Sequence, residues 1–202
     1  MVQASRKTIL ITSLLCFSIV PIYAQDSAAH LDTSGEITID GHSDPYLIHH
    51  LPVNAFPQLP AVVQQSLTHR GCLIPQTYEA HQPENVVHAS LDHHGSSDWA
   101  VLCSVNGTVS LLAFISAGNG EPAVLATAPE TSRLQPHGSS NRLGFNWAID
   151  SASPQAVHEA QLNMRHPPPR LDHDALADSV VEGRTIYRFY SHSTWTTLDT
   201  ED

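Results

Sequence analysis

The chain has 202 residues, of which 41% are hydrophobic and 14% are charged, and its 20 Asp and Glu outnumber its 9 Lys and Arg to give a formal net charge of -11. A nucleic-acid-binding protein needs a basic surface, so this charge argues against that class of function. The apolar content suffices for a hydrophobic core, and intrinsic disorder is therefore not expected. What remains is an acidic globular protein of one ordinary domain, without a motif that names its activity.

Residues 1–24 have the pattern of a cleaved secretory signal peptide. Arg6 and Lys7 precede an apolar run over residues 9–20, and the small residue Ala24 suits a signal peptidase. The run is shorter than the roughly 20 residues of a membrane span. We therefore expect cleavage after Ala24, no membrane span in the mature chain, and a periplasmic or secreted protein. An uncleaved N-terminal anchor is the alternative.

Removal of this segment changes the charge of the working molecule. It takes away Arg6 and Lys7 but no acid, which leaves seven basic residues, all Arg, against 20 acids. The mature chain then has no lysine, which excludes Schiff-base chemistry. All 14 histidines stay in it, so its charge is expected to depend strongly on pH.

Two cysteines, Cys72 and Cys103, remain after cleavage. Exported proteins meet an oxidising environment, so we predict that these two form a disulfide. The closed loop of about 32 residues corresponds to about 3 to 4 kcal/mol in the chain-entropy estimate. Two free thiols are the alternative.

The first mature segment, residues 25–53, is rich in Ser, Asp, Gly and His and is predicted to be a mobile lead-in. Only residues 36–39 alternate as an edge strand would. From Asn54, apolar residues recur at spacings of three and four until Gly71, which predicts an amphipathic helix with Asn54 as its cap. These apolar residues are Phe56, Leu59, Val63 and Leu67.

The strongest local pattern is a β-hairpin over residues 98–115. Asn106-Gly107 separates two apolar runs, and this pair is typical of a type I′ turn because both residues accept a positive φ. A two-residue turn fixes the register, so Trp99 faces Phe114 and Cys103 faces Ser110. Both faces are largely apolar, which predicts a central hairpin covered on each side, with the disulfide clamping the preceding helix onto one face.

The remaining elements are predicted with less regular patterns. Residues 156–164 fit either a strand or a short helix, and Asp172 or Asp174 is expected to cap a short helix that ends near Val181. Strands are predicted over residues 85–91, 123–126 and 143–149, and a closing hairpin over residues 185–190 and 194–198.

Together these elements predict an α+β fold. It is mainly an antiparallel β-sheet or small sandwich, with one disulfide-clamped N-terminal helix and a short C-terminal helix before a final hairpin. We expect a single domain over residues 54–202.

One set of candidate ligands for a divalent metal surrounds the loop before the hairpin. Imidazole and carboxylate groups are suitable ligands for zinc or a related ion. The same residue types are common in turns, however, and no HExxH pattern is present, so no cofactor is expected and a metal is the alternative. The candidate ligands are His88, His93, His94, Asp92 and Asp98.

Asp172-His173-Asp174 places an imidazole between two carboxylates, as acid–base chemistry would require. A helix cap by either aspartate explains the same trio, and no GxSxG elbow supplies a nucleophile. A hydrolase that uses this trio or the candidate metal ligands is the alternative function. It requires that three of these side chains converge in a concavity.

The preferred function is a non-catalytic domain that binds a protein or glycan partner. Tyr187, Tyr190 and Trp195 of the closing hairpin, together with His173, are the candidate binding residues. Aromatic side chains on an outer face favour such a role, whereas rings that fill the core beside the terminal strand would not.

The sequence LDHHGSSDWAV at residues 91–101 resembles the loop of an FG-GAP-type propeller blade. In that family the loop oxygens hold a calcium ion before a strand. This chain has one copy of the loop, and His94 stands at its middle acidic position.

A wider resemblance covers the chain from about Phe56 to its end. The motifs GCxIPQ (71–76), NVV (85–87), DWAVLCS (98–104) and DHDALAD (172–178) are similar to those of a family of exported bacterial proteins of uncharacterised function. This resemblance implies a single exported domain and no particular activity.

Overall fold

The computed structural model describes residues 31–116, 121–138, 142–162 and 170–199. The predicted signal peptide, residues 1–24, and residues 25–30 of the predicted lead-in lie outside these ranges. In the described part, no helix is long and apolar enough to cross a membrane. The helices there are α1 (Ala61–Arg70) and α2 (Pro154–Gln161).

The described strands form a large and a small sheet, and the mainly antiparallel β architecture is confirmed. The strands of the large sheet are β1 (Thr33–Ile39), β2 (His42–Pro52), β3 (Leu73–Gln76), β4 (Val86–Ala89), β5 (Asp98–Val105), β6 (Thr108–Phe114), β7 (Ala123–Pro129), β8 (Leu134–Pro136) and β9 (Leu143–Phe145). Their order is β7-β6-β5-β3-β2-β9-β8, while β1 pairs with β2 and β4 pairs with β5. Only the pairing of β2 with β9 is parallel. The small sheet is β10 (Trp147–Ala152), β11 (Ala175–Val180), β12 (Thr185–Ser191) and β13 (Thr194–Asp199).

The central hairpin, β5–β6, has the predicted register. Trp99 pairs with Phe114 and Cys103 with Ser110, and Asn106 and Gly107 both have positive φ, as a type I′ turn requires. Alternate residues along β5 enter different cores: Val101 belongs to the core on the α1 side, and Leu102 to the core on the other side. The hairpin is therefore covered on both faces.

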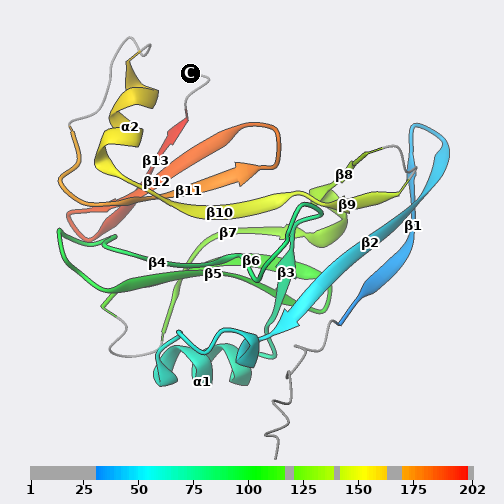
Figure 1. The fold of residues 1–202 in the computed structure, drawn as a ribbon, viewed down its shortest axis with the longest axis horizontal. Helices are drawn as coiled ribbons and strands as arrows, with labels where there is room; N and C mark the ends of the chain where they lie inside the picture. Colours follow the sequence, from blue (N-terminus) through cyan, green and yellow to red (C-terminus); the bar gives the residue numbers. More distant parts are fainter. Residues whose placement is uncertain (1–30, 117–120, 139–141, 163–169, 200–202) are drawn as a thin grey trace, which may run out of the picture.

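The helix α1 covers one face of the large sheet, and the small sheet covers the other (Figure 1). The core between α1 and β5–β6 contains Val63 and Leu67 of the helix. The core on the opposite face joins Leu102 to Trp147 of β10 and Leu176 of β11. A third small core lies between α2 and the outer face of β10–β13.

The predicted disulfide is present and fastens the end of α1 to the sheet. Gly71 ends the helix in the left-handed conformation, with φ of 74°, and Cys72 follows immediately. Its bond to Cys103 joins Cα atoms that are 5.0 Å apart. The helix itself is shorter than predicted: it begins at Ala61 instead of Asn54, because Pro60 disfavours helical backbone at Leu59.

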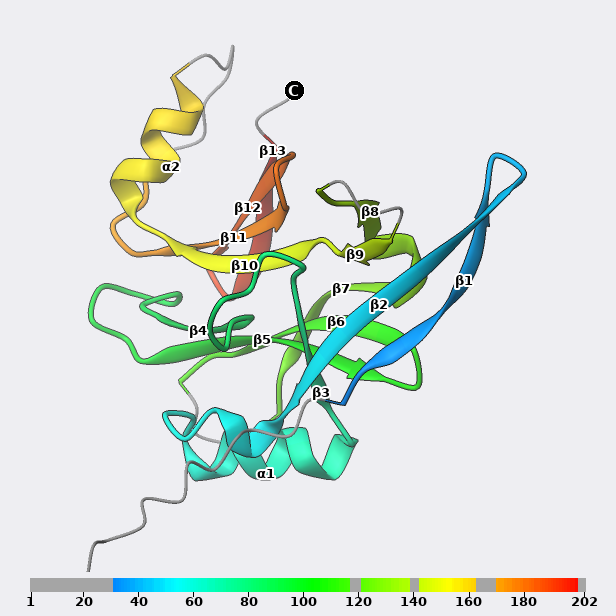
Figure 2. The same ribbon diagram turned by 45° about the vertical axis from the view of Figure 1, so that its right-hand side comes forward.

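The lead-in expected over residues 25–53 is wrong for its second half. Residues 33–52 form the β1–β2 hairpin, which projects from the molecule (Figure 2). Asp40-Gly41 makes its two-residue turn with positive φ at both positions. The expected edge strand at 36–39 is the end of β1. β2 is held in the sheet along both edges, because it pairs with β1 on one side and with β3 and β9 on the other.

The short helix expected after Asp172 is also wrong, because these residues form β11. Asp174 does not cap a helix: its carboxylate accepts the Ser90 N–H at 3.1 Å, and its own N–H donates to the Ser90 carbonyl at 2.9 Å. Non-local pairing of β11 with β10 and β12 thus overrides the local pattern. The ambiguous segment is helical up to Gln161 as part of α2, and residues 163–164 lie outside the described ranges. Ser153 caps the first turn of α2 by accepting the Ala156 N–H.

Asn85 connects the two sheets behind the loop that joins β3 to β4. It is buried and has a φ of 66°. Its side chain donates to the carbonyls of Pro75 and Trp147 and accepts the Ile149 N–H, and its own carbonyl accepts the Leu102 N–H. One residue thereby ties β3, β5 and β10 together and fixes where this loop leaves the sheet.

Candidate functional site

Asp98, a candidate metal ligand, is fully buried and organises its own loop. Its Oδ2 accepts the backbone N–H groups of Leu91 and Asp92, at 2.9 and 3.0 Å, and the hydroxyl of Ser96. Its Oδ1 accepts the Ser116 N–H at 2.6 Å. Oδ2 therefore orders the loop between β4 and β5, and Oδ1 holds the segment that follows β6.

The other candidate ligands near this loop point to different neighbours. The His88 ring stacks on Trp99 with ring centroids 4.5 Å apart, and its Nε2 lies 2.8 Å from the Ser97 hydroxyl. His93 Nδ1 lies 3.0 Å from a carboxylate oxygen of Asp92. These contacts order the loop surface and leave the imidazoles apart from one another.

His94 is exposed at the tip of the same loop, and His173 is buried, with Nδ1 3.0 Å from the Asp174 carbonyl. Within the described residues, no three His, Cys, Asp or Glu side chains are grouped so that they hold a metal ion. The structure therefore does not bring together the residues on which the hydrolase alternative depends.

The candidate binding residues Tyr187, Tyr190 and Trp195 of the closing hairpin are half-buried. Tyr187 packs against the small core under α2, and Trp195 packs against the core around Leu102. The Tyr190 and Trp195 rings meet at 5.3 Å. Most of the surface of these rings is packed inside the protein, so little aromatic surface is accessible to a ligand.

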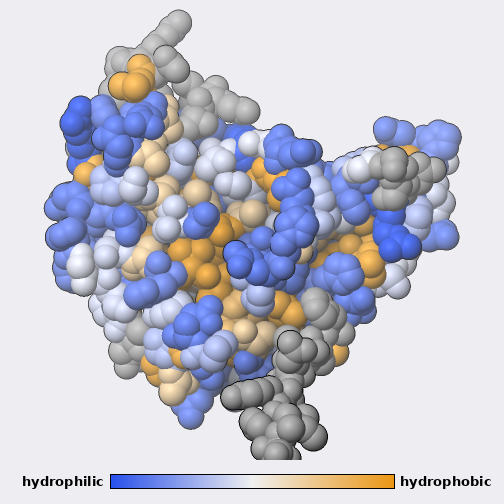
Figure 3. Space-filling view, in the orientation of Figure 1, coloured by the Kyte–Doolittle hydropathy of each residue, from blue (hydrophilic) through white to orange (hydrophobic). Residues whose placement is uncertain are grey.

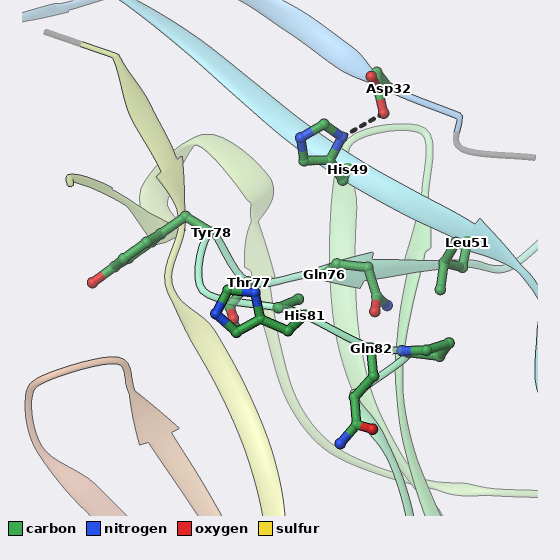
Figure 4. A pocket seen from close by; sticks show the side chains of 10 residues that line it. Asp32, His49, Leu51, Gln76, Thr77, Tyr78, His81 and Gln82 are labelled. Atoms are coloured by element: carbon green, nitrogen blue, oxygen red, sulfur yellow. Dashed lines mark hydrogen bonds and ion pairs between the residues drawn. The ribbon is translucent and has the colours of Figure 1, made fainter. Parts of the chain in front are cut away.

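A cavity of about 840 Å³ lies elsewhere, between β2 and the segment that follows β3. We call it the groove. Figure 4 shows its side chains, and the face of the molecule that carries β2 and β3 has hydrophobic residues at its centre (Figure 3). The polar residues that line the groove are Asp32, His49, Gln76, Thr77, Tyr78, His81 and Gln82.

One side of the groove comes from the β1–β2 hairpin. The pairing of these strands brings Asp32, just before β1, beside His49 of β2. The His49 Nδ1 and the Asp32 carboxylate are 2.7 Å apart (Figure 4), and both side chains remain a little over two-fifths exposed. A half-exposed imidazole with an attached carboxylate can exchange hydrogen bonds with a polar ligand.

The opposite wall is the loop between β3 and β4, and Gln76 holds it in place. The Gln76 amide donates to the carbonyls of Ile74 and Glu84, and its oxygen accepts the Glu84 N–H at 2.9 Å. The Glu84 carboxylate accepts the Thr77 N–H at 2.7 Å. These bonds close the loop at its base, so His81 and Gln82, which are both exposed, project from a fixed segment.

Tyr78 forms one end of the groove. Its ring stacks on His137 with centroids 4.7 Å apart, and its hydroxyl accepts a 2.7 Å hydrogen bond from Gln135. Burial, with the nearby carboxylates of Glu182 and Glu79, raises the pKa of the Tyr78 phenol. The phenol is therefore neutral at physiological pH.

A smaller cavity of about 150 Å³ adjoins the groove at this end. It shares His49, Gln76 and Tyr78 with the groove and extends to Arg142. The backbone passes close here, because a Cβ at Gly144 would lie 2.5 Å from the Tyr78 Cβ. A side chain at position 144 would displace Tyr78 from the end of the groove.

Sequence reasoning singled out none of the polar groove residues as a site. His49 lies in the segment that was predicted to be a lead-in. The groove is made by the pairing of β2 with β3, in which His49 faces Gln76. Local patterns carry little information on such a contact. Comparison of this chain with protein-family models, curated proteins and solved structures found no match.

Proposed function

We propose that this chain is an exported, non-catalytic binding domain of the cell envelope or secretome, and that the groove binds a glycan. The observation that carries the proposal is the groove itself. It offers about 840 Å³ between two fixed walls, with the side chains of His49, His81 and Gln82 at its surface.

Export is supported by two independent features. The N-terminal sequence has two basic residues, an apolar run and Ala24 in the order of a signal peptide. The Cys72–Cys103 disulfide is of the kind that persists in oxidising compartments. The resemblance to an uncharacterised exported bacterial family agrees with a periplasmic or secreted location, and we propose membership of that family. The FG-GAP-like resemblance concerns the loop around Asp98 alone.

The chemistry of the groove favours a glycan over other ligands. Sugar hydroxyls both donate and accept hydrogen bonds, which suits imidazole, amide and carboxylate groups on opposite walls. The C–H faces of a sugar ring suit the apolar surface that Leu51, Ala80 and Pro83 add to the lining. An extended peptide would use the same polar groups, and binding of peptides but not glycans would redirect the proposal to a protein partner.

The test compares two double variants of the exported protein. His81→Ala with Gln82→Ala removes exposed polar groups from the groove wall, and His93→Ala with His94→Ala removes exposed side chains from a loop outside it. A glycan selected from an array is titrated calorimetrically into each. We expect the groove variant to lose about 5- to 150-fold in affinity, since each of the two lost hydrogen bonds contributes about 0.5–1.5 kcal/mol. Equal losses in both variants would refute the groove as the binding site.

A further inference from the structure

A second cavity, of about 490 Å³, lies on the other face of the β1–β2 hairpin. Successive residues of a strand point to opposite faces, so Asp32 and His49 line the groove while Thr33 and His50 line this cavity. The end of α1 and the turn of the β5–β6 hairpin complete the second cavity. The two spaces are therefore separated by the hairpin.

A buried histidine and a buried glutamate, in contact with each other, form the floor of the second cavity. His50 Nε2 lies 2.7 Å from Glu130 Oε1, and His50 Nδ1 lies 2.9 Å from the Leu31 carbonyl. Each ring nitrogen of His50 thus lies within hydrogen-bond distance of an oxygen atom. The His50 and Glu130 residues are 1% and 4% exposed, so the contact between them is shielded from water.

The Glu130 carboxylate keeps one oxygen for a ligand. Its Oε1 accepts hydrogen bonds from His50 and from the Ser104 hydroxyl. Among the described residues, none donates a hydrogen bond to Oε2, and Glu130 lines the cavity, so this oxygen is available to a ligand there. Burial alone would raise the pKa of this carboxyl, but the hydrogen bonds from His50 and Ser104 and the His50 charge outweigh burial and lower it.

The cation at the rim of the cavity is Arg70, and its ion pair with Glu121 is weak. Arg70, the last residue of α1, lies 3.0 Å from the Glu121 carboxylate, whose side chain is 79% exposed. An ion pair this exposed contributes only about 0 to 1 kcal/mol. The guanidinium can therefore exchange Glu121 for a carboxylate on a ligand, which it binds through two parallel hydrogen bonds.

We propose that this cavity binds a small hydroxylated carboxylic acid of the acidic-monosaccharide class. A ligand hydroxyl donates to Glu130 Oε2, and the ligand carboxylate pairs with Arg70. An amine is disfavoured because the Arg70 guanidinium at the rim repels a second cation. The site is independent of the groove, since the two lie on opposite faces of the hairpin.

The experiment titrates glucuronate, glucose and glucosamine into the exported protein at about 0.15 M salt, where charges more than about 8 Å apart are screened. We expect glucuronate to bind at least tenfold tighter than glucose, and glucosamine not to exceed glucose. Arg70→Gln should abolish the preference for glucuronate, whereas Glu130→Gln should weaken glucuronate and glucose alike. Absence of glucuronate binding, or an unchanged preference in Arg70→Gln, would overturn the proposal.

Two further variants keep the test valid if Glu130→Gln does not fold and distinguish this cavity from the groove. Thr33→Trp fills the cavity from an exposed strand position, where an aromatic residue is well tolerated. It should abolish glucuronate binding even if Glu130→Gln does not fold. Glucuronate is also titrated into the His81→Ala, Gln82→Ala groove variant. Retained binding there supports a separate site whatever the groove binds, and loss would show that the acid occupies the groove.

Discussion

Asp98 orders a whole loop through one buried carboxylate. Its two oxygens accept three backbone N–H groups and one hydroxyl, and these donors belong to the loop before β5 and to the segment that follows β6. Buried backbone donors need such acceptors, because an unsatisfied one costs about 1–3 kcal/mol. A carboxylate in this position serves the fold and not a metal.

Replacement of Asp98 by alanine should lower the free energy of unfolding by on the order of 3 kcal/mol or more, since several buried donors lose their acceptor at once. Urea denaturation followed by circular dichroism measures the change. The exposed His94 of the same loop is the matched control, and His94→Ala should alter stability by less than about 0.5 kcal/mol. A similarly small effect for Asp98→Ala would contradict the loop-ordering role.

At the scale of elements, sequence patterns predicted the turns and strands that depend on residues close together in the chain. The β5–β6 hairpin has its predicted register because Asn106-Gly107 dictates a two-residue turn between apolar runs. The β1–β2 hairpin also has such a pair, Asp40-Gly41, at its turn, but most residues of β1 are exposed. The pattern therefore predicted only residues 36–39 as a strand, and pairing with β2 forms the rest. β11 was predicted as a helix because Asp174 resembles a cap, whereas that carboxylate binds Ser90, far away in sequence.

The groove could not be predicted for a related reason. Its two walls, at residues 32 and 49 and at residues 76–83, meet only when β2 pairs with β3. The periodicity of a sequence shows which face of a strand is buried but not which strand lies beside it. The candidate sites that sequence did indicate were local clusters, and the structure explains those clusters by loop order and core packing.

The Cys72–Cys103 disulfide should matter most for the α1 layer, because it closes a loop with a sequence separation of 31 and joins the helix end to β5. Replacing both cysteines by serine should lower the free energy of unfolding by about 3 to 4 kcal/mol on the chain-entropy estimate. Thermal unfolding of the oxidised protein and of this variant, with and without reductant, measures the difference. A reductant that destabilises the double variant as much as the unmodified protein would rule out this explanation.

At the scale of the whole molecule, the β1–β2 hairpin separates two cavities of different chemistry. The groove presents half-exposed and exposed polar side chains, whereas the second cavity presents a buried carboxylate and an arginine. The formal net charge of -11 disfavours long-range attraction of anionic ligands. The net charge does not repel a neutral glycan from the groove. Binding of an acidic ligand in the second cavity depends on the short-range attraction of Arg70.

The most direct test of the central claim is to map ligand contacts by amide chemical-shift perturbation, with the isotope-labelled exported protein titrated by its selected glycan. We predict that the shifted signals concentrate at His49 and at residues 76–83, the two walls of the groove. Shifts concentrated instead in the closing hairpin at residues 187–195, or in the Asp98 loop at residues 91–98, would contradict the proposal that the groove is the binding site.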